Sequence, residues 1–151
     1  MEAESYGNEE VAAFIQQQFI PTQAHIKEQG TVFHRFDVLW TPTVLILDPS
    51  GVERRRSEGY LPRDEFFAEL HLGLGRAAFM RKQWSEAERF YDDVIEQFPQ
   101  TTGAAEAVYW RGVCRYKRTN DHTTLPVVAA EFERQYQQTS WAKKASIWRR
   151  G

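Results

Sequence analysis

The sequence predicts a small α/β region that is followed, without a linker, by an all-helical region. A nearly continuous apolar run at residues 43–48 leads into the turn Asp-Pro-Ser-Gly and a second run with strand character. From Pro62 onwards the apolar residues recur at helical spacing instead. A weak internal repeat aligns residues 96–107 with residues 134–145 at an offset of 38. These observations give the fold class, which is α/β and then all-α.

Composition limits the function classes. The chain has 151 residues, of which 42% are hydrophobic and 26% are charged, as in an ordinary globular protein. A net charge of −2 gives no general attraction to nucleic acid or to an anionic membrane. The single cysteine, Cys114, cannot form a disulfide within the chain, and the acidic N-terminus lacks the features of a signal peptide. We therefore expect a cytoplasmic protein.

In the first region, three strands and three helices are expected in the order α-β-α-β-β-α. Asn8 caps the first helix, because Glu9 and Glu10 follow it in the first turn. Pro21 restricts the first strand to an edge or to its start. The expected elements are a helix at 9–18, a strand at 19–26, a helix at 32–38, strands at 43–48 and 52–60, and a helix that begins near residue 61.

In the second region, every expected element is a helix. The helix that begins at Leu61 or Pro62 should continue without a break to about Arg81 and so join the two regions rigidly. Ser85 and Glu88 have the spacing of a capping box, which predicts the start of the next helix. Further helices fit residues 103–118, 124–136 and 140–148. The expected domains are residues 1–72 and residues 73–151.

The helical region resembles the tetratricopeptide repeat. A first unit has residues of the expected size at the consensus positions Leu74, Gly75, Ala87, Tyr91 and Pro99. A second unit keeps Gly112 but has Gln137 where proline is usual. The resemblance implies about two helical hairpins and a closing helix, which would bind a peptide or protein on a concave face without doing chemistry. An irregular helical bundle is the alternative.

Residues 9–72 resemble the second half of a thioredoxin fold. The resemblance rests on the order of the pieces, on "WTPT", on the strand "VLILD" with its turn "PSG", and on Gly59 after the last strand. It implies that the Thr41–Pro42 peptide is the cis-proline site of that family. There, the loop formed by Trp40, Thr41 and Pro42 would present its backbone to an extended substrate.

The opening stretch "MEAESYGNEEVAAFI" resembles the segment that follows a Cys-x-x-Cys motif in that family. The resemblance implies that Met1 is an internal methionine or that the chain is a truncated version of a longer protein. It also implies a missing central strand between residues 19–26 and 43–48. We expect that strand to come from outside, by dimer exchange or from the missing segment. Direct pairing of the two strands, or a loosely held residue 1–30 segment, are the alternatives.

Other candidate sites favour structural roles. Cys114 fits a small buried packing residue. The four histidines, His25, His34, His71 and His122, lack zinc-ligand spacing, so no metal is expected. The stretch 73–78 matches a dinucleotide motif but falls inside a helix, so no cofactor is expected. For Arg54, Arg55 and Arg56, the main interpretation is that charges on an edge strand discourage edge-to-edge aggregation, and an anionic partner is the second.

Two functions remain from the sequence. The first is a protein- or peptide-binding module that has no catalytic residues and contacts neither nucleic acid nor a membrane, with a homodimer by strand exchange as one form. The second is the C-terminal portion of a thiol–disulfide oxidoreductase. It could be only a portion, because dithiol exchange needs two cysteines and this chain has one. An in-frame Cys-x-x-Cys codon pattern upstream of Met1 would favour the second function.

Overall fold

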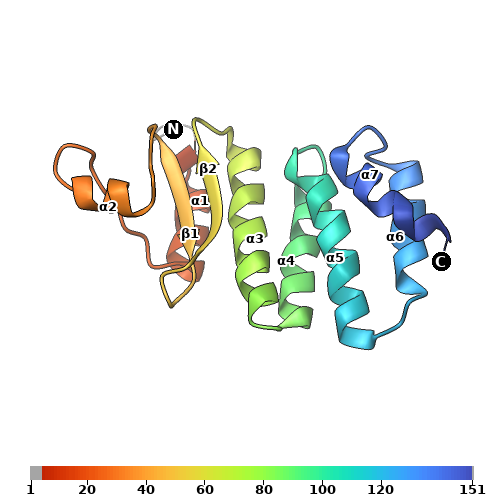
Figure 1. Ribbon diagram of the computed structural model, residues 1–151. Helices are drawn as coiled ribbons and strands as arrows, with labels where there is room; N and C mark the ends of the chain where they lie inside the picture. The colour runs from red at the N-terminus through yellow and green to blue at the C-terminus, as the bar shows by residue number, and fades with distance from the viewer. Residues whose placement is uncertain (1–4, 151) are drawn as a thin grey trace.

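The computed structural model describes residues 5–150 and shows a small two-stranded sheet followed by a row of helices (Figure 1). Most of the described chain is helical. The elements in chain order are α1 (Glu9–Gln18), α2 (Gly30–Arg35), β1 (Thr43–Leu47), β2 (Glu53–Glu58), α3 (Arg63–Met80), α4 (Trp84–Gln97), α5 (Gly103–Thr119), α6 (Thr124–Arg134), α7 (Ser140–Ala145) and a 3-10 helix at Ser146–Arg150.

Helix α1 forms as the sequence predicts. The Asn8 side chain accepts hydrogen bonds from the backbone N–H groups of Glu10 and Val11, at 3.0 and 3.3 Å. These bonds satisfy two of the donors that a helix start leaves unpaired. Val11 is fully buried, and the Phe14 ring packs on Phe67 of α3 with 5.7 Å between ring centres. Helix α1 therefore covers α3 and closes one side of the core.

The prediction of a strand at residues 19–26 is wrong. The segment has no regular structure before a turn at residues 26–28, and the side chain of Ile20 is 96% exposed. A strand needs a neighbour that takes up its backbone hydrogen bonds. The resemblance places another strand between this segment and residues 43–48, and residues 5–150 supply none. The expected helix at 32–38 is shifted and shortened to α2, which contains no buried residue.

Strands β1 and β2 form an antiparallel hairpin, as predicted. The register pairs Thr43 with Glu58 and Ile46 with Arg55, with an irregularity after Ile46. The Asp48 carboxylate accepts the backbone N–H groups of Ser50 and Val52, at 2.8 and 3.0 Å, and closes the turn. Ile46 and Val44 belong to the core between the sheet, α1 and α3.

Helix α3 is continuous from Arg63 to Met80, which confirms the prediction of one helix shared by the two regions. A Cβ atom at Gly73 would lie 2.2 Å from the Ile46 side chain, and one at Gly75 would lie 2.8 Å from the Tyr91 ring. The glycines thus allow α3 to pack against both β1 and α4. Gly73 thus serves the contact with β1, and Gly75 serves the contact with the Tyr91 ring of α4.

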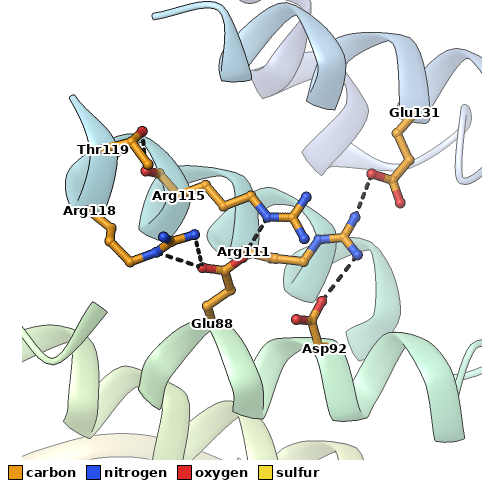
Figure 2. A network of polar contacts seen from close by, with 7 residues as sticks. All are labelled: Glu88, Asp92, Arg111, Arg115, Arg118, Thr119 and Glu131. Atoms are coloured by element: carbon orange, nitrogen blue, oxygen red, sulfur yellow. Dashed lines mark hydrogen bonds and ion pairs between the residues drawn. The ribbon is translucent and has the colours of Figure 1, made fainter. Parts of the chain in front are cut away.

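The prediction of a capping box at Ser85 and Glu88 is wrong. Helix α4 already begins at Trp84, and no side chain caps it. Glu88 instead accepts hydrogen bonds from Arg115 and Arg118 of α5, at 2.5 and 3.3 Å (Figure 2). In the same network, Arg111 bridges Asp92 of α4 and Glu131 of α6, at 3.3 and 2.5 Å. The spacing of a capping box cannot reveal these long-range partners.

The end of the chain forms a second core between α5, α6 and α7. Its fully buried or nearly buried side chains include Val108, Val128 and Phe132. A Cβ atom at Gly112 would lie 2.3 Å from Val128, so this glycine permits the close approach of α5 and α6. The expected helix at 140–148 is present as α7 and the 3-10 helix that follows it.

Candidate functional site

The loop that precedes β1 is the first candidate site. The Thr41–Pro42 peptide bond is cis, Trp40 is 68% exposed and Thr41 is also exposed. The Thr43 hydroxyl donates to the Trp40 carbonyl at 2.7 Å and holds the loop against the strand. Trp40, Thr41 and Pro42 thus form a short loop directly before β1, and the exposed indole of Trp40 is part of this loop.

One edge of β1 is open. The Gly59 N–H donates to the Pro42 carbonyl at 2.7 Å, and in the register Thr43 pairs with Glu58. Because bonded and non-bonded pairs alternate in an antiparallel ladder, the backbone groups of Val44 and Ile46 point to β2. Those of Thr43 and Leu45 point the other way, where residues 5–150 place no further strand. We call this row of outward backbone groups the β1 edge.

Exposed apolar side chains are concentrated in the same half of the chain. Of the eleven large apolar residues that are exposed among residues 5–150, eight lie between residues 20 and 60. The eight are Ile20, Ile26, Val32, Leu39, Trp40, Leu47, Val52 and Tyr60.

Cys114 lies in the interior of α5, as predicted. It is fully buried, and burial, with smaller contributions from Glu88 and Asp92, raises the pKa of its thiol to about 12. Since the thiolate is the attacking species in thiol–disulfide exchange, this cysteine is inert near neutral pH.

Arg54, Arg55 and Arg56 lie on β2, which is an edge strand of the two-stranded sheet. Arg54 pairs with Asp48 at 2.7 Å, and Arg56 pairs with Glu53 at 2.8 Å. Arg56 also donates to the Phe36 carbonyl and so connects the end of α2 to the sheet. Each of these arginines has an intramolecular carboxylate partner, so they also stabilise the fold.

Arg55 carries the most extensive of these contacts. Its guanidinium holds Glu69 of α3 through two bonds of 2.8 Å and Glu106 of α5 through bonds of 2.6 and 2.9 Å. Burial lowers the pKa of Arg55, but its hydrogen bonds to the carboxylates of Glu69 and Glu106 and the attraction of their charges more than compensate and raise the pKa. The sheet is thereby connected to both helices, which no local sequence signal indicates.

A small groove lies beside Arg55, between β2 and helices α3, α5 and α7. Its volume is about 200 Å³, and its walls include Arg54, Arg76, Trp110 and Trp141. The Arg76 guanidinium lies over the Trp110 ring at 5.1 Å from its centre. The groove combines a cation with aromatic walls, which is a suitable environment for a side chain of another molecule.

A larger cleft of about 610 Å³ lies between α1, α3 and α4. Phe14, Phe67 and Phe98 form its apolar walls, and His71 lies among them. His71 stacks on Phe14 with 4.5 Å between ring centres, and its Nδ1 atom is 2.8 Å from the Phe67 carbonyl. The sequence shows only a histidine on an apolar helix face and does not reveal this burial.

His71 should make stability depend on pH. Burial lowers its pKa below 6.5, and the Phe67 carbonyl and Asp93, whose Oδ2 atom is 3.9 Å from Nε2, compensate only in part. The unfolded chain therefore binds the proton more tightly, so this residue's contribution to stability is present above pH ~6.5 and is lost as the pH falls through its folded-state pKa. Urea unfolding between pH 7 and pH 5 should show a smaller decline for His71→Gln than for the wild type. Equal slopes would contradict this prediction.

The sequence-predicted repeat residues occupy helix–helix contacts. Ala87 is fully buried, Tyr91 is 1% exposed and contacts Gly75, and Gly112 contacts α6. Leu74 is half-buried in α3. Pro99 is exposed after α4, and its carbonyl accepts a hydrogen bond of 2.9 Å from the Tyr136 hydroxyl.

Among the side chains and helices that the structure describes in residues 5–150, there is neither a cluster of metal ligands nor a membrane-spanning helix. No group of three or more histidine, cysteine, aspartate or glutamate side chains in this range could hold a metal ion. None of the helices in this range has the length and apolar character that crossing a bilayer requires. Residues 73–78 lie inside α3 rather than at a strand-to-helix turn, where a dinucleotide motif would be placed.

Comparison with known proteins identifies the first half of the chain. Residues 1–73 match a family described as a thioredoxin-like domain, and the match ends within α3. The two-stranded sheet and the helices of the structure are consistent with a partial thioredoxin-like domain that is followed by helices. Comparison with curated proteins gave no match, and comparison with solved structures gave none.

Proposed function

We propose that this chain is a protein- or peptide-binding module, in which a partial thioredoxin-like domain at residues 1–72 is joined to tetratricopeptide-like helices at residues 73–151. The observation that carries the proposal is the β1 edge. The backbone donors and acceptors of Thr43 and Leu45 point away from β2, at the end of the sheet where Trp40 is exposed. An extended segment of a partner protein would add to this edge as a further strand.

The helical half supports the proposal through its packing. Helices α3, α4, α5 and α6 succeed one another along the chain and pack as neighbours (Figure 1). The contact of Gly75 with Tyr91 and the contact of Gly112 with Val128 place a small residue at each close approach. Arrays built in this way present binding surfaces and no catalytic groups.

Amide exchange provides the test. Random linear peptides displayed on phage are selected against the full chain, and the selected peptides are then added to isotopically labelled protein. We expect the amides of Thr43 and Leu45 to exchange fast in the free chain and to slow in the complex. The amides of Val44 and Ile46, which already bond to β2, serve as internal controls. If no peptide binds more tightly than a dissociation constant of roughly 1 mM, or if Thr43 and Leu45 stay unprotected in every complex, the proposal fails.

The same experiment can distinguish two sources of the added strand, a partner protein and a second copy of this chain. A second copy of this chain is the other occupant that the β1 edge could accept, and such pairing would make a symmetric dimer. Light scattering distinguishes the two cases. A monomer that protects Thr43 and Leu45 only with peptide supports a partner segment, and a dimer that protects them without peptide supports exchange between copies.

A second candidate function is thiol–disulfide exchange, which the match of residues 1–73 to a thioredoxin-like domain favours. The 151-residue chain should not perform it, since its single cysteine is fully buried and has a raised pKa. We expect no reduction of insulin above the rate of dithiothreitol alone. Insulin turbidity with wild type and Cys114→Ser checks this. Catalysis by both proteins would show that the reaction needs no thiol of this chain and would refute the argument.

A further inference from the structure

Arg76 differs from the other half-buried basic residues of the described chain. Six of the seven pair with carboxylates, and Arg76 alone does not. Its guanidinium lies over the rings of Trp110, at 5.1 Å, and Phe79, at 5.9 Å, and it also interacts electrostatically with Tyr91. The six paired residues are Arg54, Arg55, Arg56, Arg63, Arg111 and Arg115.

The other cations of the groove are already neutralised. Asp48 holds Arg54 through two hydrogen bonds of 3.0 and 2.7 Å. Glu69 and Glu106 together occupy the guanidinium of Arg55. Arg76 is therefore the group in the groove whose charge remains without a counter-charge among the described residues. A guanidinium whose face is stacked on an indole keeps its edge N–H groups available for a carboxylate.

The size of the groove limits what can enter it. Its volume of about 200 Å³ is below the roughly 300–1,000 Å³ of pockets that enclose small-molecule ligands. It corresponds to the space of about six or seven water molecules. One side chain of a partner fits this space, with Trp110 and Trp141 beside its apolar portion.

We propose that this groove binds an acidic side chain, glutamate or aspartate, from a peptide segment of a partner protein, with Arg76 as the residue that binds the carboxylate. This inference rests on the proposed binding function. It specifies which chemical group of the partner binds at a second position, the groove, in addition to the β1 edge. The groove is lined by residues of β2 and of helices and by no residue of β1, so the two positions can be tested separately.

Arrays of short peptides, acetylated and amidated at their ends, provide the probe. Each peptide carries one central glutamate between varied apolar residues, and a matched peptide carries glutamine at that position. Binding to the full chain is measured by tryptophan fluorescence and by calorimetry. The variants are Arg76→Gln and, as a matched control, Arg89→Gln. Arg89 also lies over a ring, that of Phe90 at 5.3 Å, but it lies on α4 and is exposed.

We expect glutamate peptides to bind about tenfold or more tightly than their glutamine partners, since a hydrogen-bonded carboxylate is lost in the second set. Arg76→Gln should remove this preference, and Arg89→Gln should keep it. A second variant, Trp141→Leu, should weaken both sets of peptides if the indole forms a wall. Melting curves establish that each variant is folded.

Two results with the peptide arrays would overturn the inference. Equal binding of glutamate and glutamine peptides would show that no carboxylate is recognised. A preference that survives Arg76→Gln would assign recognition to another residue. Each of these leaves the proposed binding function intact. Failure of every peptide to bind would contradict this inference. The proposed binding function would then be tested separately, by amide hydrogen exchange at Thr43 and Leu45.

Discussion

Arg55→Met should lower the free energy of unfolding by roughly 2–4 kcal/mol. The substitution keeps the apolar stem of the side chain but leaves the carboxylates of Glu69 and Glu106 together without the Arg55 guanidinium. Both carboxylates are largely buried, with side-chain exposures of 18% and 17%. For a chain of this size the midpoint of thermal unfolding should fall by about 5–15 °C, which calorimetry measures.

Two further variants isolate the cause of this loss. The triple variant with Arg55→Met, Glu69→Gln and Glu106→Gln should regain at least half of the lost stability, because it leaves no uncompensated charge. Arg63→Met removes a cation whose partners Glu10 and Asp64 are exposed, and it should cost less than about 1 kcal/mol. If Arg55→Met costs no more than Arg63→Met, the connection of β2 to α3 and α5 does not depend on Arg55.

Gly75→Val and Tyr91→Ala should each destabilise the chain but should compensate each other in combination. A Cβ atom at position 75 would lie 2.8 Å from the Tyr91 ring, so valine forces the ring to move at a cost of roughly 1–3 kcal/mol. Tyr91→Ala removes a ring that is 1% exposed and should cost roughly 3–5 kcal/mol. The double variant should be more stable than the sum of the two losses predicts, by about 1 kcal/mol or more.

Urea unfolding of the four proteins measures this coupling. Gly30→Ala is the control, since no atom lies within 4 Å of a Cβ atom built there and the position starts a helix. It should change stability by no more than about 0.5 kcal/mol. Strictly additive losses for Gly75→Val and Tyr91→Ala would show that α3 and α4 do not meet at these two residues.

The elements that the sequence predicts correctly are those whose causes are local. Asn8 and the two glutamates after it specify the start of α1 within a few residues. The turn at Asp48 is likewise held by bonds to Ser50 and Val52. Helix α3 needs only an apolar period and the absence of a break between Arg63 and Met80.

The failures concern partners that are distant in the sequence. Residues 19–26 have strand character, but strand formation depends on a neighbouring strand that the segment cannot itself supply. Glu88 pairs with Arg115 and Arg118, which lie 27 and 30 residues away. The groove was not predictable either, because β2, α3, α5 and α7 each contribute to its walls. Trp40, Thr41 and Pro42 are adjacent in the sequence, and that candidate loop could be found without the structure.

The continuity of α3 fixes the rotation of one half of the molecule relative to the other. Successive residues of a helix turn by about 100°, so Gly73 and Gly75 face directions that differ by roughly 200°. Gly73 meets Ile46 of the sheet, and Gly75 meets Tyr91 of α4. Inserting a single residue between them would turn α4 and all later helices by about 100° around the axis of α3 and would carry Glu106 away from Arg55. Surface loops of this chain can therefore vary in length, but the stretch from Gly73 to Gly75 cannot.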